Sequence, residues 1–223
     1  MQNSRNFYEL FDACQQEGCP FCRVAHDSIT RYLDSWKYEV FTDVEDRERL
    51  RRSQGFCHAH TSHLVRMGAS IQLAQAYQAV LTDTIEQLQA NLSGQHGRGR
   101  RRLFETKRER AICPACLQLE GIEADLVLTL RRALLDSQFY ERFCNSQGLC
   151  LPHLRLTTEL KLPDVGGDWL SLLQKAEIVC LQRLDAQLSE LIRKHDYHFK
   201  DEEKGDEMRS WQRAAGLVAG EEW

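Results

Sequence analysis

Cys19-Pro20-Phe21-Cys22 is followed by Ser53-Gln54-Gly55-Phe56-Cys57-His58-Ala59-His60, and the pattern returns as Cys113-Pro114-Ala115-Cys116 and Ser146-Gln147-Gly148-Leu149-Cys150-Leu151-Pro152-His153. The copies are offset by 94 residues at the first motif and by 93 at the second. Residues between the motifs also agree at an offset of 93, since Asp43 aligns with Asp136 and Glu48-Arg49-Leu50 with Glu141-Arg142-Phe143. We therefore predict that the chain contains one unit twice.

Each copy offers three cysteines and one histidine as two i, i+3 pairs, which is a complete ligand set for a zinc ion or an iron–sulfur cluster. The partial positive charge and free N–H groups of helix N-termini would stabilise the thiolates of both pairs. We expect one site within each copy. The predicted first site is Cys19, Cys22, Cys57 and His60, and the predicted second site is Cys113, Cys116, Cys150 and His153.

The identity of the metal is left open by the spacing. Zinc, two ions per chain, is the favoured interpretation, and an iron–sulfur cluster in each site is the alternative. Two matching copies argue against simple buried thiols. Redox catalysis by Cys-Pro-x-Cys requires a strand followed by a helix, which this sequence does not indicate.

The remaining cysteines and histidines fall outside the repeated set. Cys14, Cys144 and Cys180 have no counterpart in the other copy, so we expect core or surface thiols, with Cys14 as a conceivable substitute ligand because it precedes Cys19 by five residues. His58 and His63 align with leucines. The histidines expected at the surface are His26, His96, His195 and His198.

The composition is that of an ordinary soluble protein, with 42% hydrophobic and 28% charged residues among 223. The net charge of −4 gives no overall nucleic-acid signature. Nine cysteines without an apolar leader at the N-terminus predict a reducing cytoplasm rather than a disulfide framework. No run approaches the roughly 18 apolar residues of a membrane span, so we expect no membrane association.

Helical spacing of apolar residues dominates the sequence, and strand-like alternation is scarce. Helices are predicted from Cys19-Pro20 to Trp36, over Asp43–Arg52, from Cys57 onward and over Ile71–Leu92, with Gly55 forming a helix-ending turn. In the last of these, an apolar stripe recurs every three or four residues, at Ile71, Ala74, Tyr77, Leu81, Ile85, Leu88 and Leu92. A second long stripe runs from Trp169 to Ile192. The predicted fold is all-α, a pseudo-twofold duplication of a metal-stapled helical unit.

Four segments organise the chain: a first metal-binding repeat over 1–95, a basic linker over 96–110, a second repeat over 111–195 and a tail over 196–223. The glycine- and arginine-rich linker looks too flexible to hold the repeats together, so we expect each metal to be closed within its own repeat. We also expect the repeats to superpose by a rotation near two-fold. The tail should form a helix that packs through Met208, Trp211, Ala215 and Val218, or else binds a partner.

No phosphate loop, Ser-His-Asp set or paired-carboxylate site is indicated by spacing, and no motif points to an enzyme. The sequence favours a non-enzymatic binding or adaptor protein with an unknown protein partner and an undetermined oligomeric state. The alternatives are an iron–sulfur electron carrier or redox sensor, and a nucleic-acid-associated regulator. The last would use the basic residues Arg98, Arg100, Arg101, Arg102, Lys107, Arg108 and Arg110.

The chain resembles an uncharacterised family of bacterial proteins, a domain of unknown function with tandem Cys-Pro-x-Cys … Gly-Phe-Cys-x-x-His units. The resemblance covers nearly the whole length. It rests on both cysteine–histidine sets and on the ending His195-Asp196-Tyr197-His198-Phe199 … Ser210-Trp211 … Arg213-Ala214 … Gly220. It implies a metal-binding helical protein and supplies no activity. Leu151-Pro152 replaces the His-Ala of the first copy without removing a ligand.

Overall fold

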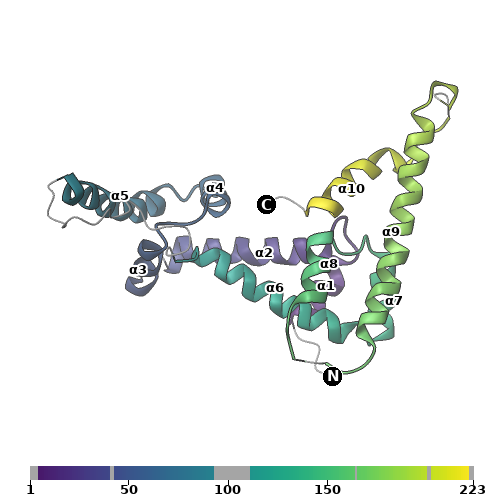
Figure 1. Cartoon of the computed structure of the whole chain (residues 1–223), viewed down its shortest axis with the longest axis horizontal. Helices are drawn as coiled ribbons and strands as arrows, with labels where there is room; N and C mark the ends of the chain where they lie inside the picture. The colour runs from purple at the N-terminus through teal and green to yellow at the C-terminus, as the bar shows by residue number, and fades with distance from the viewer. Residues whose placement is uncertain (1–4, 41–42, 93–110, 164, 200–201, 221–223) are drawn as a thin grey trace. The chain divides into compact units, whose positions relative to one another are not determined.

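The computed structural model describes residues 5–40, 43–92, 111–163, 165–199 and 202–220 (Figure 1). These residues are helical, turn or irregular and include no strand, which confirms the all-α prediction. The linker over 96–110, with His96 and the basic run, lies outside them. The helices are α1 (Arg5–Ala13), α2 (Pro20–Ser35), η1 (Trp36–Val40), α3 (Val44–Arg52), α4 (His58–Arg66), α5 (Ser70–Leu92), α6 (Pro114–Ala133), α7 (Ser137–Asn145), α8 (Leu151–Glu159), α9 (Trp169–Lys194), η2 (Tyr197–Phe199), η3 (Asp206–Arg209) and α10 (Ser210–Ala219).

The predicted helix starts are confirmed, and each has a local cause. Asp43 caps α3, where its carboxylate accepts hydrogen bonds from the backbone N–H groups of Glu45 and Asp46 at 2.8 and 3.1 Å. Asp136 caps α7 in the same way, with both distances at 3.0 Å. Pro20 and Pro114 each occupy a first helical position, where the missing N–H costs nothing. The aligned aspartates therefore begin aligned helices.

The repeated Ser-Gln-Gly tripeptide forms the turn that leads into each Cys-x-x-His helix. Gly55 lies at φ 92°, and its N–H bonds the Leu50 carbonyl at 2.9 Å, so the predicted turn ends α3. Ser53, 2% exposed, donates its hydroxyl to the same end of α3. Ser146 does so for α7, donating to the Phe143 carbonyl at 2.7 Å. Each turn thus delivers a cysteine directly to the next helix start.

The chain forms two compact units, and each draws on both predicted repeats. Unit 1 comprises Met1–Asp27 and Gly121–Glu222, and unit 2 contains Ser28–Glu120. Helix α2 consequently begins in unit 1 and ends in unit 2, whereas α6 begins in unit 2 and ends in unit 1. The units do not follow the predicted division at 96–110. The near two-fold relation between the repeats stays a prediction.

Each unit has its own apolar core. In unit 1, α9 packs against α7 and α10, and α1 packs against α7. Its rings include Phe7, which lies 5.6 Å from Phe139, and Phe143, which is fully buried. In unit 2, the rings of Trp36 and Phe56 meet edge to face at 5.0 Å. The Phe56 contact sits beside the turn that carries Cys57, so core packing fixes the position of that thiol.

The apolar stripe on α5 and the predicted packing side of the tail helix both face largely outward. On α5, Tyr77 is half-buried, but Ile71, Leu81, Ile85 and Leu92 are 53 to 89% exposed. This helix packs on α3 through the neighbouring face, which includes Leu73. The tail helix α10 does pack, on α8 and α9, but through the face of Ser210 and Leu217. On that helix Trp211, Ala215 and Val218 are exposed. Apolar spacing reveals a stripe, not which element covers it.

Among the described helices, none has the length and apolar character needed to cross a bilayer.

Candidate metal centres

The first Cys3His group lies in unit 1 and joins Cys19 and Cys22 to Cys150 and His153, all four of them buried. The Cys22 and Cys150 sulfurs are 3.7 Å apart, although the residues are 128 positions apart in sequence. Nδ1 of His153 lies 3.6, 3.4 and 3.1 Å from the sulfurs of Cys19, Cys22 and Cys150, respectively. All ligand atoms converge on one point between the starts of α2 and α8.

The second group lies in unit 2 and joins Cys57 and His60 to Cys113 and Cys116. The Cys57 and Cys116 sulfurs are 3.7 Å apart. Nδ1 of His60 lies 3.2, 3.7 and 3.6 Å from the sulfurs of Cys57, Cys113 and Cys116. Cys57 and Cys116 are partly exposed, so this group is nearer to solvent than the first.

All eight predicted residues therefore fall into two groups that could each hold a metal ion, but the predicted pairing within each repeat is wrong. Cys19 and Cys22 meet the Cys-x-x-His pair of the second repeat, and Cys113 and Cys116 meet that of the first. The cause lies in helix length. The 16 residues of α2 make a rod about 24 Å long, and the 20 residues of α6 one of about 30 Å. Each rod carries the chain away from the thiols that open it, so the next Cys-x-x-His pair meets the other repeat's thiols.

The spacing of the ligand atoms matches coordination of a single ion. Zinc lies about 2.3 Å from sulfur and about 2.0 Å from nitrogen, so a regular tetrahedron places its sulfurs about 3.8 Å apart and sulfur about 3.5 Å from nitrogen. The Cys22–Cys150 and Cys57–Cys116 sulfur distances are both 3.7 Å, and the sulfur–nitrogen distances span 3.1 to 3.7 Å. All atoms of a group lie within 4.8 Å of one another.

Burial makes a cation favourable at both groups. It raises the pKa of the Cys19 thiol well above its ordinary value and also raises the pKa of Cys116. Thiolates at these positions therefore need a positive charge beside them, which a metal ion supplies. Burial, reinforced by His63, lowers the pKa of His60 and keeps its imidazole neutral, the form that binds metals.

His153 differs from His60 because a carboxylate supports it. Burial opposes its protonation, yet hydrogen bonds with Cys150, Cys22 and Glu123 raise its pKa to about 11. Its Nε2 lies 3.3 Å from Oε1 of Glu123, on the side of the ring away from the sulfurs. A carboxylate at this nitrogen fixes the ring and strengthens Nδ1 as a ligand. Sequence analysis missed Glu123, because α6 brings it to His153 from 30 positions away.

A buried carboxylate on α9 holds the turn before Cys150. Oε1 of Glu177 accepts a hydrogen bond from the Leu149 N–H at 2.9 Å, and the residue is only 3% exposed. Gly148 lies against it at φ 76°, where a Cβ would stand 2.7 Å from Oε2 of Glu177. The repeated glycine is therefore needed here for both conformation and space. Burial raises the pKa of Glu177 to about 7.

Glu177→Gln should make the protein less sensitive to alkaline pH. Because the pKa of Glu177 is raised from 4.5 to about 7 on folding, its favourable contribution is complete below pH 4.5 and is lost as the pH rises through 7. The shift corresponds to about 3 kcal/mol. Denaturant unfolding at pH 5 and pH 8 should show the variant gaining up to about that amount over the wild type at the higher pH. The exposed Glu159→Gln is the control, and equal pH responses in all three proteins would contradict the prediction.

The other thiols and histidines stay outside both groups. Cys14 and Cys180 are buried and Cys144 is partly exposed, and none of them joins either group. His195 and His198 are exposed as predicted. His63 is 8% exposed and lies 3.4 Å from the hydroxyl of Thr30, so it is a core residue of unit 2.

The fold and the two groups define a helical protein with two Cys3His groups that could each hold a metal ion. Residues 7–222 match the family of unknown function DUF6062, and the chain belongs to that family. The resemblance inferred from the motifs is thereby confirmed. Neither the curated proteins nor the solved structures include a match.

Proposed function

We propose that this protein is a non-enzymatic binding protein of the reducing cytoplasm whose fold is held by two structural zinc ions. The observation that carries the proposal is the joining of remote segments by each Cys3His group, across 128 to 134 positions in unit 1 and 53 to 59 in unit 2. Four protein ligands fill a tetrahedron and leave no open position for substrate, which is the pattern of structural zinc. The nine free cysteines support a reducing compartment.

The compact ligand spacing favours one ion over the iron–sulfur alternative. In a cluster the ligands are shared among different irons, so their atoms spread further than around a single ion. The atoms of each group instead lie within 4.8 Å of one another. Protein purified without oxygen should be colourless and contain about two zinc ions per chain by elemental analysis. Iron with acid-labile sulfide and absorbance at about 400 nm would overturn zinc in favour of an electron carrier or redox sensor.

The partner surface that we assign is the outward face of α5. Seven of its exposed positions follow a heptad, with Ile71, Gln78, Ile85 and Leu92 in one row and Ala74, Leu81 and Leu88 in the other. The helix is 23 residues long, or about 35 Å, enough for three heptads. The flanking positions are uncharged, namely Gln75, Thr82, Gln89, Tyr77, Thr84 and Asn91. Two identical helices can pair without like-charge repulsion, so the assigned occupant is a second copy of this chain.

Light scattering should therefore give the mass of a dimer. Leu81→Lys places like charges at the centre of the proposed seam and should give a monomer with its metal content unchanged. Thr82→Lys lies beside the two rows rather than in them, so it should weaken the dimer less than Leu81→Lys does. A monomeric wild-type protein, or a dimer that both variants leave intact, would rule out this surface.

A further inference from the structure

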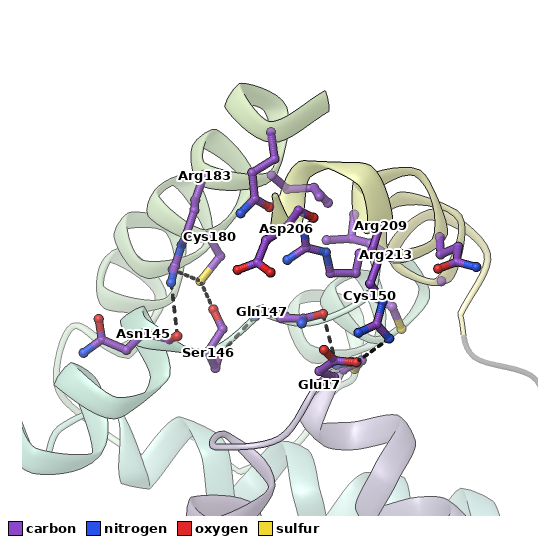
Figure 2. Close-up of a pocket in the computed structure, with 18 of the residues that line it drawn as sticks. Glu17, Asn145, Ser146, Gln147, Cys150, Cys180, Arg183, Asp206, Arg209 and Arg213 are labelled. Atoms are coloured by element: carbon purple, nitrogen blue, oxygen red, sulfur yellow. Dashed lines mark hydrogen bonds and ion pairs between the residues drawn. The ribbon is translucent and has the colours of Figure 1, made fainter. Parts of the chain in front are cut away.

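A cavity of about 510 Å³ lies in unit 1 beside the first Cys3His group (Figure 2). It is bounded by the start of α2, the turn before Cys150, the middle of α9 and the η3–α10 segment. Cys19 and Cys150 contribute to its wall. The volume is within the range of sites for metabolite-sized molecules. Neither the metal groups nor the α5 surface account for this cavity.

Four arginines and two carboxylates line the cavity, which gives a positive excess. The arginines are Arg23, Arg183, Arg209 and Arg213, and the acids are Glu17 and Asp206. Figure 2 shows Arg183, Arg209 and Arg213 around the cavity. Among the described residues, only Arg209 of these four has a carboxylate partner, Glu17 at 3.4 Å, and both of these side chains are more than two-thirds exposed. Such an exposed pair is weak and can open to a ligand.

Backbone carbonyls hold the other three arginines. Arg23 donates to the Glu17 carbonyl at 2.6 Å, Arg183 to the Asn145 carbonyl at 3.1 Å, and Arg213 to the Asp206 carbonyl at 2.8 Å. A carbonyl fixes a guanidinium in place without neutralising its charge. The arginines are thus positioned by the protein while their positive charges remain available, which suits them to planar oxyanions.

Two guanidinium N–H groups are also left over. The Nε atoms of Arg23 and Arg213 are buried without a hydrogen-bond partner among the described residues. A buried, unpaired donor costs free energy, and more so on a charged group. The uncharged side chain of Gln147 extends the polar lining. Its Oε1 accepts a hydrogen bond from the Gly18 N–H at 3.0 Å. Arg23 and Arg213 therefore have unused hydrogen-bonding capacity at Nε in addition to the charge that they bring to the cavity wall.

We propose that this cavity binds a small molecule carrying a phosphate or carboxylate group. The inference specifies the ligand class of the binding protein proposed above and rests on that function. Gln147 and Cys150 belong to one turn, and Gly18 and Cys19 to another. The same two turns therefore carry lining residues of the cavity and ligands of the first Cys3His group. Ligand binding should therefore strengthen metal retention at that group, and metal should strengthen ligand binding by the same factor.

Calorimetric titration of the metal-loaded, full-length protein with inorganic phosphate and with citrate, at constant ionic strength, tests the proposal. At least one anion should bind saturably, and Arg213→Gln should weaken it about tenfold. Arg155→Gln, which removes an exposed arginine of α8 outside the cavity, should not. Preference for phosphate or for citrate identifies the group that is recognised.

Metal content measured on the same samples separates the two proposals. Two zinc ions with no saturable anion binding up to about 10 mM would overturn the cavity assignment alone. Anion binding weakened equally by Arg155→Gln and Arg213→Gln would overturn it as well. So would a protein that binds heparin but neither phosphate nor citrate. Protein without bound metal would contradict the proposed function instead.

Discussion

Cys22→Ser combined with Cys150→Ser is expected to remove one metal ion from the chain, whereas Cys22→Ser combined with Cys57→Ser should remove both. The first pair damages a single group, since Cys22 and Cys150 lie together in unit 1. The second pair damages one ligand in each group. Closure within each repeat would give the opposite result. Elemental analysis of the purified variants distinguishes the two arrangements.

The stability of these variants should follow their metal content. A structural zinc site can contribute about 10 kcal/mol or more of apparent binding energy to folding, so loss of both ions should leave the chain largely unfolded. The single variants Cys22→Ser and Cys116→Ser should each retain about one ion. They therefore still measure metal loss from each group if a double variant fails to fold. Cys14→Ser, Cys144→Ser and Cys180→Ala should keep both ions, because none of these thiols belongs to a group.

Cutting the chain between the repeats should leave the two fragments bound together until the metal is removed. A site for a specific protease inserted between Gly97 and Arg98 divides the purified protein into two fragments, each with two ligands of each group. The fragments should elute as one species and separate when a chelator is added, since each ion then bridges two chains.

The matched control carries Cys22→Ser and Cys116→Ser in the same cleavable chain. Both groups are then incomplete, and the fragments should separate without a chelator. Separation of the cleaved wild-type fragments while both ions remain bound would show that the ligands pair within each repeat after all.

Local features of this fold could be predicted from the sequence because their causes are local. Asp43 caps α3, Gly55 ends it and Cys57 begins the next helix, each through contacts within a few residues. The eight candidate ligands were identifiable because i, i+3 pairs of cysteine and histidine form on one helical turn.

Long-range features were not predictable in the same way. Which Cys-x-x-His pair reaches which Cys-Pro-x-Cys pair depends on the lengths of α2 and α6, and an argument from linker flexibility gave the wrong answer. Glu123 and Glu177 are single acidic residues with no pattern around them, and only packing brings them to His153 and Leu149. The stripe on α5 was recognised, but its exposure depends on what the rest of unit 2 covers.

The crossed ligand pairing also sets the order in which a ribosome can complete the two centres. The groups are nested along the chain: the inner one is complete once Cys116 has emerged, and the outer one, begun at Cys19, only at His153. The 37 residues between these points take about 2 to 7 s to synthesise at typical rates of protein synthesis. Through that interval Cys19 and Cys22 are already made while Cys150 and His153 are not, so the nascent chain carries two thiols of an unfinished group that the finished protein buries.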